Sequence, residues 1–533
     1  MNNKNYLNLS ILLIFSSYLI LGALIFSDYG ISWDEYYHRI NGFVSLNIVR
    51  EFFSLDLYQG VEHGDKIFGD STKHYGVIFD LPMAYIEKFF NISDSKNYFL
   101  LRHFSNFFIF YISSIFFYLL LKKRFSNYLS IIGLLFFILS PRIFAESFYN
   151  MKDVIFLSLF VISLYFAITF LNNPNYKNLI FSALTCSFAI DLRVLGLIVP
   201  FIVIVFLILA IMENKIYFKN YFLKLFIFAL SVVFFTILFW PFLWNDPFIN
   251  FAAALKAMSS YPMRLNVFYL GEYVSAVNLP WHYPIVWIFI TTPILYLVLF
   301  LLGSFFIAYN FTIRFLNMSE ENNTTDPWSN NFERMDIIFF LIFYFSLFLV
   351  IQINATLYGG WRHLYFIYPC LIYISVKGIE NISKYFKFKY LLIIIVPFLI
   401  YTSYWMFKNH PYQFVYFNKF AGKNVPEKFE LDYWGVSNKN SLSYISNIDK
   451  RKKINIFIKS VSPYEFSSLI LNENDRDRLI FTKDLDEAEF LVTNHYYQNG
   501  NPIIINNKLK KDFDLVNEIK VDNLTINSIY RKK

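Results

Sequence analysis

Two adjacent acids stand directly behind the first long apolar stretch of the chain, in the segment GISWDE at residues 30–35. A carboxylate next to hydrocarbon costs free energy unless a partner stabilises it, so acids in this position are candidates for function. Carboxylates can also accept the proton of a hydroxyl group during a reaction. Asp34 and Glu35 are therefore the first candidates for catalytic residues, and the rest of the chain must show what positions them.

The composition is typical of a membrane protein. Of 533 residues, 56% are hydrophobic and only 16% are charged, and the mean hydropathy is +0.42, which is far more apolar than a soluble domain. The net charge of +8 comes largely from short basic runs between apolar stretches, such as 122–124 and 384–389. This pattern indicates cytoplasmic loops and gives no reason to expect a nucleic-acid partner. Cys186 and Cys370 lie inside apolar stretches, which predicts neither a disulfide nor a cysteine metal site.

Eleven apolar stretches approach the length of about 20 residues that crosses a bilayer. They cover residues 7–27, 103–121, 127–141, 153–171, 177–192, 194–212, 222–243, 285–310, 335–353, 364–378 and 389–406. Basic loops flank the pair 177–212 on both sides, so the pair must cross twice and leave Asp191 and Arg193 at the outer face. We expect a retained first span, a cytoplasmic N-terminus and an external C-terminus.

This topology gathers the unusual polar residues on the outer face. The first outer loop, residues 28–102, is about 75 residues long and contains Lys73 and His74. Such a length is unusual for a simple connector. The second outer loop contains Arg142 and ends at Asp153, an acid at the beginning of the fourth span. The remaining outer candidates are Arg193, Arg362 and His363.

The extramembrane parts have patterns of their own. Two aromatic-rich stretches of the first outer loop, 36–53 and 75–90, are expected to form helices in the membrane interface. We divide the chain into a transmembrane catalytic domain, 1–406, and an extracytoplasmic domain, 407–533. The second part alternates apolar runs with charged stretches, which predicts a small α/β domain. Its expected strands are 454–458, 479–482, 490–493 and 503–505.

The acidic pair behind the first span, the acid at the fourth span, the long first outer loop and the number of spans together resemble the GT-C membrane glycosyltransferases. The most similar branches are the protein O-mannosyltransferases of glycosyltransferase family 39 and the lipid A aminoarabinose transferases. The resemblance covers residues 7–406. The segments that look like a bacterial subgroup of this superfamily are SPRIFAESFYNMKD (140–153), YGGWRHLYFIYP (358–369), HPYQFVYFN (410–418) and DYWGVS (432–437).

The resemblance implies a polytopic α-helical fold of about 11 transmembrane helices with a small C-terminal α/β domain. It also implies an inverting hexosyl- or pentosyltransferase in the bacterial inner membrane. Such an enzyme moves a sugar from a polyprenyl-phosphate donor to a glycan, lipid or protein acceptor on the outer face. The partners implied are therefore the lipid-linked donor, this acceptor and the surrounding membrane lipid.

Roles for individual residues follow from the same resemblance. Asp34 is the expected base for the acceptor hydroxyl, with Glu35 as the second acid of the pair. Asp153 matches the acid that organises the donor phosphate or a divalent ion in relatives, and whether a metal takes part here is left open. Lys73 and His74 fall near the phosphate-contacting segment. The other expected substrate-binding residues are Arg142, Arg193, Arg362 and His363.

Several of these residues also fit purely structural roles. Glu35 stands three residues after a serine, which is the spacing of a capping box at a helix start. Arg193 also fits an ion pair with Asp191 that closes a hairpin. The long side chains of Lys73 and Arg362 can reach the membrane interface without any ligand.

Other functions fit such a hydrophobic chain less well. A transporter or flippase of lipid-linked sugars would place paired charges near the middle of the bilayer and show inverted repeats. Here the charges gather at the outer rim. A lipid-glycan ligase or polymerase would share this location and differ in its donor. A non-catalytic scaffold gives no reason for acids at three separate span ends.

The pattern of basic loops predicts the sidedness of the chain. Reporter fusions after Lys123, Lys219 and Lys387 are expected to give cytoplasmic signals, because basic loops are retained inside. A fusion after Lys533 is expected to give an external signal. A cytoplasmic signal from this last fusion would contradict the outer placement of every candidate residue.

Overall fold

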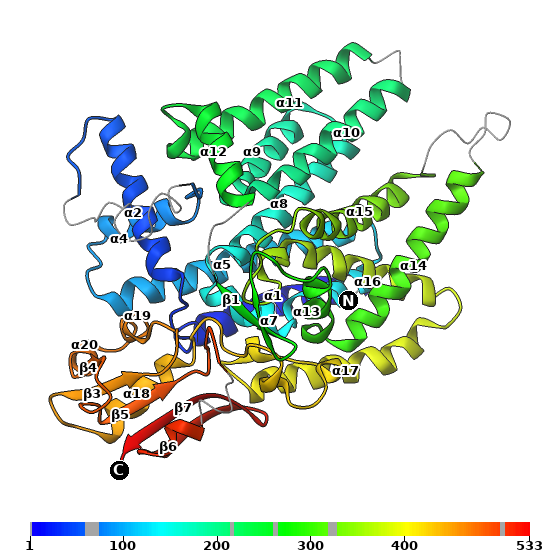
Figure 1. Cartoon of the computed structure of the whole chain (residues 1–533). Coiled ribbons are helices and arrows are strands. Elements are labelled where there is room, and N and C mark those ends of the chain that lie inside the picture. Colours follow the sequence, from blue (N-terminus) through cyan, green and yellow to red (C-terminus); the bar gives the residue numbers. More distant parts are fainter. Residues whose placement is uncertain (1–2, 59–73, 214–217, 260–264, 318–327, 501–506) are drawn as a thin grey trace.

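The computed structural model of the chain describes residues 3–58, 74–213, 218–259, 265–317, 328–500 and 507–533. These residues form a large helical body with a small sheet at one end, drawn in orange and red in Figure 1. The expected fold class, a polytopic helical protein with a small C-terminal α/β part, is confirmed.

Eight helices within the described ranges are long and apolar enough to cross a membrane, as expected of an integral membrane protein. They are α1 (Asn3–Ile25), α5 (Ser95–Lys122), α8 (Asp153–Asn172), α10 (Ile198–Glu213), α11 (Phe218–Phe239), α14 (Ile294–Leu316), α15 (Asn331–Gln352) and α17 (Phe388–Lys408). The other three predicted spans correspond to shorter helices. These are α6 (Asn127–Ile138), α9 (Tyr176–Leu192) and α16 (Tyr368–Ile382).

Two predicted spans are interrupted near prolines. The span expected over 127–141 is wrong at its end, because α6 stops at Ile138 and α7 (Pro141–Tyr149) continues at an angle of 61°. The span expected over 285–310 divides into α13 (Tyr283–Thr291) and α14, with Pro293 between them. Proline has no N–H to donate and disfavours a helical conformation in the preceding residue. The first break places α7 inside the protein, where all its residues are buried.

The first outer loop folds onto α5 through buried charges. Its two aromatic-rich stretches form helices α2 (Glu35–Phe52) and α4 (Asp80–Phe89), as expected. Arg102 of α5 is fully buried, and its Nε donates to Glu87 Oε1 at 2.8 Å. Arg39 of α2 donates to the other oxygen of Glu87, also at 2.8 Å. Because a buried charge is stable only with partners, these pairs hold α2 and α4 against the membrane part.

The C-terminal part contains a five-stranded sheet in the order β4-β3-β5-β7-β6. Its parallel strands β3 (Ile454–Ile458), β4 (Leu479–Thr482) and β5 (Phe490–Thr493) confirm three predictions. The expected strand at 503–505 lies outside the described residues. The antiparallel strands β6 (Phe513–Val521) and β7 (Leu524–Lys532) were not expected, because polar residues interrupt the apolar residues of β6 and only its two ends are buried.

The remaining elements are short. They are α12 (Pro247–Ser259), β1 (Asn266–Tyr269), β2 (Glu272–Ser275), α18 (Asn438–Ile448), α19 (Tyr464–Ser468) and α20 (Glu473–Arg476), with several 3₁₀ turns between the helices. Strands β1 and β2 form an antiparallel hairpin whose loop residues, Leu270 and Gly271, both have positive φ. This conformation matches the twist of a two-residue hairpin loop.

Helices α14 and α16 approach each other through glycines. A Cβ on Gly303 would lie 1.9 Å from the carbonyl oxygen of Ile374, and one on Gly378 would lie 2.2 Å from that of Leu299. Only glycine, which has no side chain, allows the two backbones to approach this closely. Small residues at such contacts are common between membrane helices. The pair therefore fixes α16 in the interior of the helical body.

Replacing Gly303 by Val is expected to destabilise the folded protein, because the new side chain forces the two backbones apart. Overpacking of this kind costs about 1–3 kcal/mol, and thermal unfolding of the purified protein in detergent measures it. The matched control is Leu301→Val on the same helix, whose side chain is exposed. Equal unfolding temperatures for the two variants would contradict this account of the α14–α16 contact.

Candidate functional site

A buried arginine connects two acids that stand at separate span ends. Arg362 Nη1 lies 3.3 Å from Asp34 Oδ2 and 2.8 Å from Asp153 Oδ2. Arg193 forms a second ion pair with Asp153, through its other oxygen. Asp153 and Arg362 expose 1% and 2% of their side chains, whereas Asp34 exposes 32%. The structure thus unites four predicted residues, Asp34, Asp153, Arg193 and Arg362, in what we name the acid–arginine cluster.

Each member of the acid–arginine cluster stands at the end of a helix. Asp34 is the N-cap of α2, and Asp153 is the first residue of α8. Arg193 directly follows α9, and Arg362 opens the 3₁₀ helix η5 (Arg362–Ile367). Apolar spans keep charged residues out of the hydrocarbon, so the polar ends of several helices meet at a similar depth. The negative charge of Asp153 is also favourable at a helix N-terminus.

Asn150 orients the buried acid. Its Oδ1 accepts the backbone N–H of Asp153 at 2.9 Å, and its Nδ2 donates to Asp153 Oδ2 at 3.2 Å. The same Nδ2 donates to Glu146 at 2.8 Å. Tyr365 donates its hydroxyl to the other oxygen of Glu146 at 2.6 Å. Sequence reasoning missed these three residues, although Glu146 and Asn150 are spaced four apart and so share one face of α7.

Aromatic rings enclose the guanidinium of Arg362. Its central carbon lies 4.6 Å from the ring centroid of Tyr358, 5.4 Å from that of Tyr433 and 4.5 Å from that of Trp434. Such cation–π contacts are most favourable where water is excluded. Tyr433 and Trp434 follow the last helix of the body, so the C-terminal part of the chain completes the site. No role was expected for these two rings.

A tight turn places Tyr433 and Trp434. The side chain of Asp432 accepts the backbone N–H groups of Val436 and Ser437, each at 3.1 Å. Gly435 has φ +71°, and a Cβ there would lie 2.2 Å from Ser462 Oγ. Burial raises the pKa of Asp432 to about 6, against the opposing effect of its hydrogen bonds. The turn therefore depends on a glycine and on a carboxylate that is ionised at neutral pH.

Two further basic side chains lie beside the acid–arginine cluster. Burial and then the charge of Arg193 hold the pKa of Lys152 well below its usual range. The His363 ring packs edge-on against the ring of Tyr358, with the two ring centroids 4.8 Å apart. Burial and the charge of Arg362 lower the pKa of His363 well below its usual value, so this imidazole is neutral at neutral pH. With His363 neutral, the two arginines and the two aspartates of the acid–arginine cluster balance each other in charge.

Other candidates have different partners. Glu35 accepts the backbone N–H of Ser32 at 2.6 Å, which is the capping contact, and contacts His103 Nε2 at 2.9 Å. Asp191 accepts the backbone N–H of Ile78 at 2.9 Å. The alternative in which Arg193 pairs with Asp191 is therefore wrong, since Arg193 turns toward the beginning of α8.

Three more predicted residues stand apart from the acid–arginine cluster or cannot be placed. Arg142 lies over the rings of Trp287 and Phe417, at 5.5 and 5.8 Å. His74 packs edge-on against Phe242 at 5.4 Å. Lys73 lies outside the described residues.

The arrangement does not fit a metal ion held between the two acids. Arg362 Nη1 contacts both carboxylates and so occupies the place that a bridging cation would take. Over the described ranges, no three His, Cys, Asp or Glu side chains are grouped so that they could hold a metal. The cations that the structure places against the two acids are the guanidinium groups of Arg193 and Arg362.

One protein-family model matches part of the chain. Residues 83–240 match the dolichyl-phosphate-mannose-protein mannosyltransferase family, and this stretch contains Asp153 and Arg193. The expected resemblance to GT-C glycosyltransferases is confirmed. No curated protein matches the chain by sequence.

Two solved structures are similar over most of the chain. The oligosaccharyltransferase of Archaeoglobus fulgidus, in complex with Zn and sulfate, has a TM-score of 0.45 at 12% identity, covering 90% of this chain and 68% of that one. ArnT from Cupriavidus metallidurans, bound to undecaprenyl phosphate, has a TM-score of 0.43 at 10% identity, covering 98% of each chain.

Arg362→Ala is expected to destabilise the protein strongly, because it leaves the buried Asp153 with one cation in place of two. Removing one partner of a buried ion pair costs about 3–5 kcal/mol, which thermal unfolding of the purified protein measures. Adding Asp153→Asn to this variant should recover part of the loss. The control is Lys408→Ala, which breaks an exposed pair with Asp522 of at most about 1 kcal/mol. Equal losses in the Arg362 and Lys408 variants would contradict the central position of Arg362.

Proposed function

We propose that the chain is an inverting glycosyltransferase that moves a sugar from a polyprenyl-phosphate carrier to a hydroxyl acceptor on the outer face of the membrane. The observation that carries this proposal is the acid–arginine cluster, in which a partly exposed carboxylate stands beside buried cations. The family match over residues 83–240 supports glycosyl transfer, and its name describes a sugar carried on a lipid phosphate. The outer placement rests on the pattern of basic loops.

Asp34 is the carboxylate suited to act as the base. Its side chain is one-third exposed, and Arg362 contacts only one of its oxygens, Oδ2. The second oxygen can accept the proton of the acceptor hydroxyl. Asp153 is buried and receives hydrogen bonds from Arg362, Arg193 and Asn150, so it serves to hold the cations in place.

The transfer is a single displacement. The acceptor oxygen forms a bond to the anomeric carbon on the face opposite the phosphate, while the bond from that carbon to the phosphate oxygen breaks. The electron pair of this bond stays on the leaving polyprenyl phosphate, and the hydroxyl proton passes to Asp34. Because attack and departure take place on opposite faces, the anomeric configuration inverts.

The leaving phosphate gains negative charge, which fixed cations in a dry site stabilise. Arg193 exposes 14% of its side chain and is thus the more accessible of the two arginines that contact Asp153. Lys152 adds a third basic side chain, whose pKa is lowered by burial and by the charge of Arg193 and would be raised by a bound phosphate. We infer that these side chains face the donor phosphate.

An apolar cavity near Arg193 suits the lipid part of the donor. It has a volume of about 180 Å³ and is lined almost entirely by apolar side chains, among them Ile190, Leu197 and Phe251. Ile190 and Leu197 lie three residues before and four residues after Arg193 in the chain. A polyprenyl chain is a hydrocarbon, so it gains free energy when such a surface covers it.

Asp34→Asn is expected to lower transfer by about 10²–10⁴-fold, because the amide keeps the shape of the side chain but cannot accept the proton. The purified protein is incubated with a panel of polyprenyl-phosphate sugars, and product formation is measured. The matched control is Glu35→Gln, since glutamine also serves in a capping box and a lost cap costs only ~1 kcal/mol.

The two neighbouring variants separate catalysis from architecture. Asp34→Asn should keep the unfolding temperature and lose turnover, whereas Glu35→Gln should keep most of its turnover. Near-wild-type turnover in both variants would contradict the assignment of Asp34 as the base. A folding defect in Asp34→Asn without a kinetic defect would instead indicate a structural role.

A further inference from the structure

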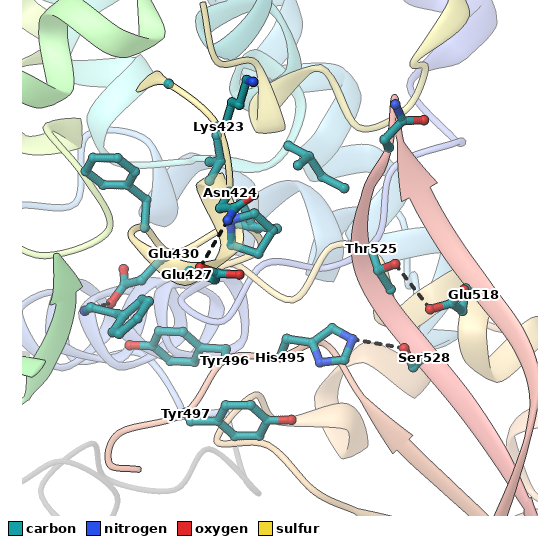
Figure 2. A pocket seen from close by; sticks show the side chains of 18 of the residues that line it. Lys423, Asn424, Glu427, Glu430, His495, Tyr496, Tyr497, Glu518, Thr525 and Ser528 are labelled. Carbon is teal, nitrogen blue, oxygen red and sulfur yellow. Dashed lines mark hydrogen bonds between the residues drawn. The ribbon is translucent and has the colours of Figure 1, made fainter. Parts of the chain in front are cut away.

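A cavity of about 720 Å³ lies where the C-terminal sheet meets the helical body (Figure 2). Its walls come from residues 422–431 after α17, from the β1–β2 hairpin, and from the segment after β5 together with strands β6 and β7. The volume falls within the range of about 300–1,000 Å³ that is common for small-molecule sites. Among the described residues that line it, none belongs to the acid–arginine cluster.

Aromatic rings form a large part of the cavity wall. The rings are those of Phe268, Tyr273, Phe429, Tyr496, Tyr497 and Tyr530. The face of an aromatic ring carries partial negative charge and attracts groups with a positive edge. A pyranose ring offers groups of this kind, because C–H groups make up one of its two faces. Tyr273 is partly exposed, whereas the other five rings expose at most 7% of their surface and back the wall from behind. Tyr273 is therefore the ring that can stack on a sugar.

Polar side chains in the cavity wall form hydrogen bonds with one another. Figure 2 shows His495 Nε2 directed at Ser528 Oγ, 2.9 Å away. Thr525 Oγ1 donates to Glu518 Oε1 at 3.2 Å. His495 has φ +58°, a left-handed conformation that is costly for a non-glycine residue and is often retained at functional sites. Sugar hydroxyls both donate and accept, so they can bond to either member of such pairs.

The charge of the lining is balanced. Glu430 is buried and accepts the backbone N–H of Phe268 at 2.9 Å. Burial raises the pKa of Glu430 to about 8, so this carboxyl group is protonated at neutral pH and can donate as well as accept. The other charged lining residues are two lysines and two glutamates, Lys423, Lys510, Glu427 and Glu518. Opposite charges in equal number favour a neutral polar ligand over an ion.

Aromatic contacts connect the cavity with the acid–arginine cluster. Tyr496, in the cavity wall, has its ring centroid 5.4 Å from that of Tyr433 and 6.1 Å from that of Trp33. Tyr433 covers Arg362, and Trp33 precedes Asp34 in the chain. A ligand in the cavity is therefore separated from the base and the arginine by a single layer of rings.

We propose that this cavity binds neutral sugar units of the acceptor, so that the acceptor is a glycan whose remote part lies here, one layer of rings away from Asp34. The identification of the ligand as the acceptor rests on the proposed function, whereas saccharide binding is a property of the cavity alone. Balanced charge, an accessible tyrosine ring and paired hydroxyl-binding groups all belong to one site of sufficient volume.

The test measures saccharide binding to the full-length protein in lipid nanodiscs without any donor. The probes are the neutral trisaccharides mannotriose, maltotriose and chitotriose. Their binding is measured by titration calorimetry and by saturation-transfer NMR. Thr525→Trp fills the cavity from strand β7, and His495→Ala removes one hydrogen-bonding group. Each variant should weaken binding about tenfold or more. The matched control is Thr482→Trp on strand β4, which does not line the cavity and should bind as the wild type does.

The outcomes separate this inference from the proposed function. Failure of the wild type to bind any of the three trisaccharides would overturn the inference, as would binding that neither cavity variant weakens. Binding of a Ser/Thr-rich peptide at the cavity in place of a saccharide would also overturn it and would indicate a protein acceptor. His495→Ala enlarges the cavity, whereas Thr525→Trp fills it. If both variants fold and both lose saccharide binding, the cause of the loss lies in the cavity. Saccharide binding without sugar transfer would support this inference and contradict the proposed function.

Discussion

The charge of Arg362 must be compensated inside the protein, and much of the site depends on this constraint. A guanidinium group cannot lose its proton under ordinary conditions, and taking it out of water is costly unless carboxylates and hydrogen bonds surround it. Asp34 and Asp153 supply the opposite charge, and Tyr358, Tyr433 and Trp434 cover the group with their rings. Segments more than 300 residues apart in the chain therefore meet at one side chain.

The same constraint makes the C-terminal part a component of the site. Trp434 covers Arg362 and also accepts, through its carbonyl oxygen, the backbone N–H of Trp33 at 3.2 Å. Lys439, a few residues further on, donates to the carbonyl oxygen of Ser27 just after α1. Burial lowers the pKa of Lys439 to about 8, with Asp28 opposing the shift. Trp434 and Lys439 thus hold the loop that carries Asp34. A displacement of this loop would expose the segment of Trp434, and the reverse is also true.

Sequence reasoning found the acid–arginine cluster because its members share a simple property. Asp34, Asp153, Arg193 and Arg362 all stand at helix ends, where apolar spans bring charged residues to a similar depth. The direction in which each side chain points was not predictable, since successive residues of a helix point about 100° apart. Glu35 consequently contacts His103 and not the acid–arginine cluster. The rings from 433–434 had no local pattern to reveal them. Prolines that divide two predicted spans were visible in the sequence, but the depth of each break depends on packing.

The two acids of the cluster have the same chemical group and opposite environments, and environment decides what such groups do. Asp153 is buried and paired on both oxygens, so accepting a further proton would cost it two ion pairs. Asp34 is partly exposed and paired on one oxygen, so a proton on the other leaves the contact with Arg362 in place. An acid that must take up and release a proton in every cycle is therefore better placed at the rim than in the interior. The cavity beside Tyr496 is separated from this rim by the rings of Trp33 and Tyr433. In the proposed mechanism, the acceptor therefore approaches from the side of Asp34, and the donor phosphate lies on the side of Arg193.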